Sequence, residues 1–245
     1  MNNRGLLIAG ILAFVVGASA LVPARVVYHW AAAPELSLAG ISGTVWNGRA
    51  EHASVAGIYF RNLEWRLRPL SLLAAKLSFD AKAEPVSGFV EGRFSAGLGG
   101  KLQVSGLTAS LRLAAFANAL QMQGLSGSTS IRFEQLRIED GLPVAATGTV
   151  EVADLLAPTI HRQIPLGGYR AEFVTEENGI AASIEDTDGV FDLAGRLNVD
   201  SNRSYRFLAK LAAKPSAAEA LTSQLRFLGT PDSSGQYELR LEGQL

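Results

Sequence analysis

The chain has 245 residues, contains no cysteine and carries 22 basic against 23 acidic side chains. Its length fits one large domain or two small ones. The lack of cysteine excludes disulfides, thiolate nucleophiles and cysteine-based metal sites. The near balance of charge gives no long-range field that would attract a nucleic acid.

An uncharged run of 18 residues, Gly5–Val22, follows the first four residues. As a helix it would be about 27 Å long, close to the roughly 30 Å thickness of a bilayer core. Pro23 ends the run, and Tyr28 and Trp30 follow at the level where interfacial aromatic side chains are common. We therefore predict a transmembrane anchor at 5–22, with residues 1–4 in the cytoplasm.

The alternative for this segment is a cleavable signal peptide. Ala18-Ser19-Ala20 fits a small-residue cleavage pattern, but the apolar run is longer than the usual 7–15 residues of a signal peptide. The length favours an uncleaved anchor. Residues 23–39 would then be a juxtamembrane linker, and 40–245 a periplasmic β domain.

Beyond the anchor, apolar and polar residues alternate with a period of two. The clearest apolar series are Leu77, Phe79, Ala81 and Ala83; Phe191, Leu193, Leu197 and Val199; Tyr205, Phe207, Ala209 and Leu211; and Tyr237, Leu239 and Leu241. Such strands have one buried and one solvated face, which is typical of antiparallel sheets. Asp140-Gly141, Asn178-Gly179 and Asp188-Gly189 are hairpin-turn dipeptides. The pattern predicts a mainly β chain with one large, curved antiparallel sheet.

Two or three short helices interrupt this pattern. Ser216–Leu228 begins with a capping box, in which Ser216 and Glu219 satisfy each other's backbone donors, and continues with leucines at helical spacing. The alanine-rich stretch Leu113–Met122 is a weaker candidate. Pro69–Lys76 is predicted to form a helical turn.

The residues that could take part in catalysis or metal binding lack the neighbouring residues that such motifs require. His29, His52 and His161 lie far apart in sequence, without neighbours at metal-ligand spacing. Gly97–Leu102 resembles a phosphate loop, but no Ser or Thr follows its lysine. Asp186 and its neighbours match only part of a calcium loop. We predict no catalytic residue, no metal and no cofactor.

Two motifs stand out at the start of the expected β domain. They are Gly43-Thr44-Val45-Trp46-Asn47-Gly48 and Leu63-x-Trp65-x-Leu67-x-Pro69. The residues alone indicate a strand, a turn, a second strand and a short helical corner, with Trp65 in the core beside Leu63 and Leu67. The candidate structural motif consists of Gly43, Trp46, Gly48, Trp65 and Pro69.

The order of these motifs resembles the type II secretion system protein N family. The resemblance continues through Pro165–Tyr169, Gly189–Leu197 and Leu225–Gly229. It implies a single-pass protein of the inner membrane with most of its chain in the periplasm and no catalytic residues. Its partners would be other secretion components, such as the inner-membrane platform and the secretin. Its function would be to support export of folded periplasmic proteins through scaffold or assembly contacts.

The alternation itself suggests a second class of function. A long antiparallel sheet with one very apolar face and few covering helices would form an open trough, as in proteins that resemble the AsmA-like carriers of lipid. The alternative is that the sheet folds on itself and fills the trough with its own side chains.

Overall fold

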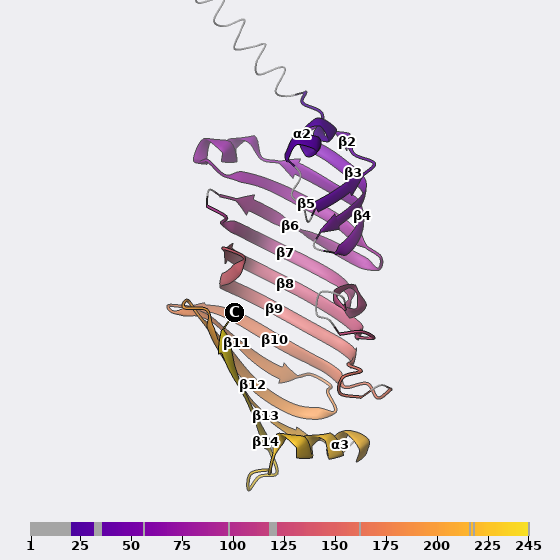
Figure 1. The fold of residues 1–245 in the computed structure, drawn as a ribbon, viewed down its shortest axis with the longest axis vertical. Helices are drawn as coiled ribbons and strands as arrows, with labels where there is room; N and C mark the ends of the chain where they lie inside the picture. Colours follow the sequence, from indigo (N-terminus) through magenta and orange to yellow (C-terminus); the bar gives the residue numbers. More distant parts are fainter. Residues whose placement is uncertain are drawn as a thin grey trace, which may run out of the picture.

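The computed structural model describes residues 21–31, 36–55, 57–97, 99–117, 122–161, 163–215, 217 and 219–244. All fourteen strands in this part of the chain belong to one antiparallel sheet. They follow one another in chain order from β1 to β14, except that β1 and β2 both pair with β3 (Figure 1). The prediction of a mainly β chain with a large antiparallel sheet and few helices is confirmed.

The strands are β1 (Leu36–Ala39), β2 (Ser42–Gly43), β3 (Asn47–Val55), β4 (Ile58–Leu67), β5 (Leu77–Pro85), β6 (Gly88–Ala96), β7 (Leu102–Arg112), β8 (Ser126–Glu139), β9 (Leu142–Leu156), β10 (Gly167–Glu176), β11 (Gly179–Asp186), β12 (Phe191–Asp200), β13 (Ser204–Ala213) and β14 (Tyr237–Gln244). The helices are α2 (Ala24–Ala31) and α3 (Glu219–Leu225), with 3₁₀ turns η1 (Pro69–Ala74), η2 (Leu113–Phe116) and η3 (Arg226–Leu228).

The predicted interruptions appear where the sequence placed them, although two are shorter. The helical turn after Pro69 is η1. Of the stretch Leu113–Met122, the described residues form only the four-residue turn η2, and 118–121 lie outside the description. The helix of the C-terminal region begins at Glu219 as α3, while Ser216 of the expected capping box lies outside the described residues.

The described residues include only part of the predicted N-terminal segments. Residues 5–20 of the predicted anchor lie outside the described part, in which no helix is long and apolar enough to cross a bilayer. The expected juxtamembrane linker, 23–39, contains α2 and the edge strand β1. The sheet therefore begins at Leu36, before the predicted boundary at Gly40.

Connections of two kinds lie at opposite ends of the strands. Since each strand reverses the last, successive connections alternate between the two ends. Short turns join β8 to β9, β10 to β11 and β12 to β13 at one end. The long connections 113–125, 157–166 and 214–236 all lie at the other end (Figure 1).

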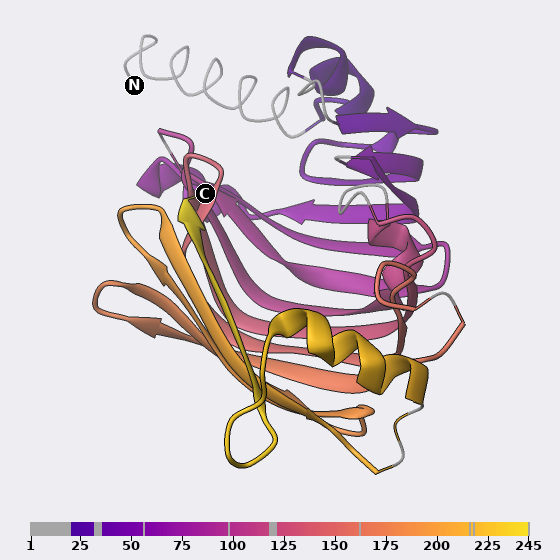
Figure 2. The ribbon, with the colours of Figure 1, turned by 60° about the horizontal axis from the view of Figure 1, so that its bottom comes forward.

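The hydrophobic core lies under the long connections. Its buried members are Leu113, Leu125, Ala157, Leu166, Phe191, Leu211, Leu221 and Leu225. Leu221 of α3 is fully buried, and α3 lies across the concave side of the sheet near β12 to β14 (Figure 2). The core is therefore concentrated at one end of the C-terminal part of the sheet.

Bulges help the sheet to curve without losing its apolar face. Asn62 in β4 and Gly106 in β7 have positive φ values of 50° and 61°, and the strand register shifts beside both. Such bulges bend a strand and reverse its alternation. As a result Leu63, Trp65 and Leu67 point to the same side as Phe60, although the spacing from Phe60 to Leu63 is odd.

Candidate functional site

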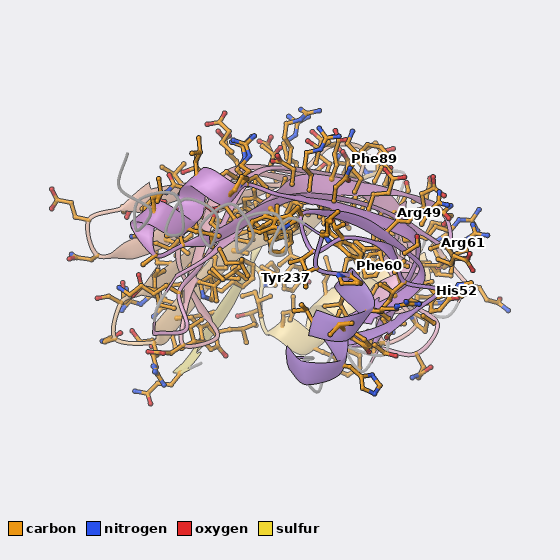
Figure 3. The ribbon with its side chains drawn as sticks, turned by 90° about the horizontal axis from the view of Figure 1, so that it is seen from above. Arg49, His52, Phe60, Arg61, Phe89 and Tyr237 are labelled. Atoms are coloured by element: carbon orange, nitrogen blue, oxygen red, sulfur yellow. The ribbon has the colours of Figure 1, made fainter. Side chains whose placement is uncertain are left out.

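The inner, concave face of the sheet is a continuous apolar surface. Figure 3 shows Phe60 and Tyr237 inside the curve, and Arg49, Arg61 and Phe89 on the outer side. Directly opposed residues of antiparallel strands share a face, so the register defines rows that cross the sheet. One apolar row is Leu67, Phe79, Phe94, Val104, Leu136 and Ala146. A second is Leu107, Phe133, Gly148, Phe173, Ala182, Leu197, Phe207 and Leu241.

The aromatic members of these rows pack against each other. The rings of Phe79 and Phe94 are stacked with centroids 5.5 Å apart, and those of Phe133 and Phe173 are tilted at the same distance. All four side chains are half-buried. No member of either row belongs to the core cluster beneath α3. The two rows are therefore an apolar surface with its own internal packing, separate from that core.

The outer, convex face is polar. Next in sequence to the first apolar row is a polar row that points to the convex side. It consists of Arg66, Asp80, Arg93, Ser105, Gln135 and Thr147. Asp80 accepts hydrogen bonds of 2.9 Å from both Arg68 and Arg93. Burial alone would raise the pKa of Asp80, but the two guanidinium groups outweigh it and lower the pKa.

A hollow of about 420 Å³ lies among the polar side chains around Asp80. Lys82 pairs with Glu91 at 2.9 Å within its lining, so the charges there neutralise one another. No group of three His, Asp or Glu side chains in the described residues is arranged to hold a metal ion. This hollow offers paired surface charges and no arrangement of a nucleophile with a base.

One ion pair lies at the covered end of the concave face. Asp186 accepts from Lys214 and from the backbone N–H of Leu193, and its side chain is only 9% exposed. Burial would raise the pKa of Asp186, but the ammonium group and the N–H lower it overall. Opposite it in the register, Tyr169 donates to the carbonyl of Leu166 at 3.0 Å. Burial and then the charge of Asp186 raise the pKa of Tyr169 to about 12.

Four of the five residues of the candidate structural motif meet in one corner. The indole of Trp65 donates to the carbonyl of Val45 at 3.1 Å, and the carbonyl of Trp46 accepts from Leu67 at 2.7 Å. Gly48 lies directly under the indole, where an added Cβ would come within 2.4 Å of the ring. Trp65 therefore requires glycine at position 48.

Gly43 lets the chain make the tight turn into this corner. Its φ is +84°, and a Cβ there would lie 2.6 Å from the carbonyl oxygen of Asn47. Thr44 closes the turn, since its N–H donates to that carbonyl at 3.0 Å and its hydroxyl accepts from the N–H of Asn47 at 3.2 Å. Pro69 stands apart from the indole and starts η1 two residues after Leu67.

The corner also holds the chain that arrives from the N-terminus. The N–H of Val45 donates to the carbonyl of Val22 at 3.1 Å, and Pro23 forms a bridge with Thr44. Trp65 shares a face with Leu63 and Leu67, as the sequence predicted, but it is half-buried and lies outside the core cluster. The sequence gave no sign of the connection to Val22. No signal in the sequence pairs residue 22 with residue 45.

Other residues singled out in the sequence have hydrogen-bond or ion-pair partners within the fold. His161 accepts from the N–H groups of Gln163 and Ile164 at 3.2 and 3.0 Å. Asp186, considered above as part of a calcium loop, binds Lys214 instead. Tyr28, expected in a membrane interface, hydrogen-bonds to β1 through its hydroxyl. Sequence reasoning missed the partners of Asp186 and Tyr28, because each is set by tertiary structure.

These observations define a protein built on one curved sheet, with an apolar inner face, a charged outer face and a tryptophan corner at its start. The chain belongs to the type II secretion system (T2SS) protein N family, whose sequence model matches residues 34–240. It is 24% identical over 226 residues to the type II secretion system protein N of Aeromonas hydrophila, covering 90% of this chain and 89% of that protein. It is 26% identical over 238 residues to the protein of the same name from Vibrio cholerae serotype O1, covering 91% of each. No solved structure matches the chain.

Proposed function

We propose that this chain is a non-catalytic component of the type II secretion system that supports export of folded proteins by scaffold or assembly contacts. In this proposal residues 5–22 anchor it in the inner membrane and the sheet extends into the periplasm. Its partners are the inner-membrane platform and the secretin. The observation that carries the proposal is the family match over 34–240, which includes nearly all of the sheet.

The geometry supports a scaffold in two ways. The tryptophan corner ties Val22 and Pro23 to the turn between β2 and β3, so an anchor that ends at Val22 would be joined closely to the sheet. A membrane anchor keeps the sheet close to membrane-embedded partners and raises its effective concentration there. The polar groups of the convex face pair with one another in ladders of the kind expected for a stable surface.

Loss of the chain should block release while leaving substrate folding intact. In a strain without the chain, a secreted enzyme should accumulate in the periplasm in its active, protease-resistant form. Full-length chain should restore release. A variant with Gly48→Trp, which overfills the corner, should be tested beside the conservative Arg49→Lys on the adjacent, outward-pointing position. Normal release without the chain would refute a role in export.

The concave face supports a second candidate function, the carriage of a lipid or another apolar ligand. Two apolar rows cross the sheet outside the core cluster, and five of their members are phenylalanines. Acyl chains are bound by apolar surface of this kind, since burial contributes about 0.8 kcal/mol per CH₂.

Two phenylalanines on β6 allow a matched test of ligand binding. Phe94 lies in an apolar row, whereas Phe89 is on the convex face and 45% exposed. Full-length chain extracted in a mild detergent should be analysed for bound lipid by native mass spectrometry. Phe94→Asp should abolish any bound lipid and Phe89→Asp should not. Equal lipid in both variants would assign it to the anchor and oppose the carrier function.

A further inference from the structure

The two edge strands of the sheet, β1 and β14, differ in what lies against their outer sides. At one end, β1 is only four residues long, and the hydroxyl of Tyr28 covers its free side. That hydroxyl accepts from the N–H of Leu38 at 3.0 Å and donates to the carbonyl of Leu36 at 3.3 Å. Two of the backbone groups that another strand would need on β1 are therefore already bonded.

At the other end, β14 is eight residues long and has no such cover. Among the described strands it pairs with β13 alone. It contains no proline and no bulge, two of the devices that protect an exposed edge, although it does carry charged side chains at Glu238, Arg240 and Glu242. Leu241, on the concave face, remains 50% exposed although its neighbours in the second row are half-buried or buried. An open edge with an exposed leucine is typical of a strand that pairs further.

The sequence of β14 is complementary to itself when reversed. Around Leu241 it places Arg240 on one side and Glu242 on the other. If Leu241 faces Leu241 of a second copy, each Arg240 lies opposite a Glu242, and Leu239 lies opposite Gly243. Both opposed pairs have unlike charge, which stabilises antiparallel pairing. The side chains of Arg240 and Glu242 are 63% and 56% exposed. Within one copy Arg240 already lies 3.1 Å from Glu238 and Glu242 lies 3.6 Å from Arg206, so the second copy would add a further partner to each.

We propose that two copies of this chain pair through their β14 strands, antiparallel and about a two-fold axis at Leu241. Because Tyr28 already bonds two backbone groups of the four-residue strand β1, pairing of β14 with β1 of another copy, which would build an open-ended fibre, is disfavoured. The closed alternative is the isologous pair. The two-fold axis is perpendicular to the sheet, so both concave faces open on the same side and their apolar rows join through Leu241. This inference does not depend on the role in secretion.

A single introduced cysteine tests the register, because the chain has none of its own. Full-length Leu241→Cys in membranes should form a reducible homodimer on mild oxidation. Leu239→Cys, on the same strand and face, would be about 13 Å from its counterpart, since opposed residues are four positions apart at roughly 3.3 Å each, and should remain monomeric. Val174→Cys, exposed on the convex side of β10, controls for random collision.

Charge reversal tests the same interface independently. Arg240→Glu should lower the homodimer fraction about tenfold, because it places like charges opposite each other twice. The double variant Arg240→Glu with Glu242→Arg should restore it. Circular dichroism and thermal midpoints identify any variant that has not folded, and Arg240→Gln gives a milder second measurement in that case.

Several results would overturn the proposal. A monomeric Leu241→Cys chain, equal crosslinking of Leu239→Cys and Leu241→Cys, or a homodimer unaffected by Arg240→Glu would each do so. A disulfide adduct of any other mass would point to a strand from a different protein and would also overturn it.

Discussion

The concave face has a part that is covered by α3 and the long connections and a part, the two apolar rows, that lies outside the core cluster. The same sequence pattern produces both parts. In both, apolar residues alternate with polar ones along antiparallel strands. At the covered end, α3 and the long connections add leucines from above, and Phe191 and Leu211 become buried. Along the two apolar rows, large side chains such as Phe94 and Phe133 have only their neighbours in the sheet and stay half-buried.

The difference shows that alternation determines which side chains share a face of the sheet, but not whether other residues pack over that face. Burial of Phe191 requires residues that break the period of two, and these come from the connections at one end of the strands. The turns that join β8 to β9, β10 to β11 and β12 to β13 at the opposite end contain only a few residues and cannot reach over the sheet. The stability of the chain should therefore depend most on the covered end.

The largest expected effect is at Leu221, the fully buried leucine of α3. Leu221→Ala should lower the free energy of unfolding by about 4 kcal/mol, because it leaves a cavity between α3 and the sheet. Phe227→Ala in the adjacent turn η3 is the control, since that side chain is 86% exposed. Denaturant unfolding measures both. A small effect at Leu221 would mean that the covered end is no more stable than the rest.

The tryptophan corner should give the next largest effect. Trp65→Ala removes a half-buried indole and its hydrogen bond to Val45, and should cost about 3 kcal/mol. Gly48→Ala should cost about 2 kcal/mol by forcing the indole aside. The double variant should cost less than the sum of the two single variants, because the clash of the new methyl group with the ring disappears. Strict additivity would show that the contact is not important for stability.

Much of this architecture could be predicted from the sequence. The alternation predicted the antiparallel sheet, and Asp140-Gly141 predicted a turn that both residues make with positive φ, at 51° and 79°. Trp65 was placed on the correct face because its neighbours two positions away are leucines. The contacts that span long sequence distances could not be predicted. Tyr28 on β1 and Lys214 on Asp186 depend on tertiary packing, which local periodicity does not encode.

The ion pair of Asp186 and Lys214 should give a smaller, pH-dependent effect. The folded protein lowers the pKa of Asp186, so the pair stabilises the fold above the unfolded value of about 3.9 and loses this contribution as pH falls through the lower folded value. Asp186→Asn should cost about 2 kcal/mol at neutral pH. It should also make stability less sensitive to acid below about pH 4.

Unfolding midpoints measured from pH 2 to pH 7 distinguish this effect from simple packing. Asp188→Asn, on a neighbouring exposed carboxylate, is the matched control for the same chemical change outside the ion pair. Parallel profiles for the native chain and Asp186→Asn would show that the ion pair does not contribute to acid sensitivity.

The smallest effect is expected on the uncovered rows, where it tests the comparison itself. Phe94→Ala removes a half-buried ring that stacks on Phe79 and should cost about 1–2 kcal/mol, well below the cost at Leu221. Phe89→Ala on the opposite face of β6 should cost less still, because its ring is more exposed. If Phe94→Ala were as costly as Leu221→Ala, something in solution must cover the apolar rows. If that excess cost disappeared after delipidation, the cover would be a bound lipid.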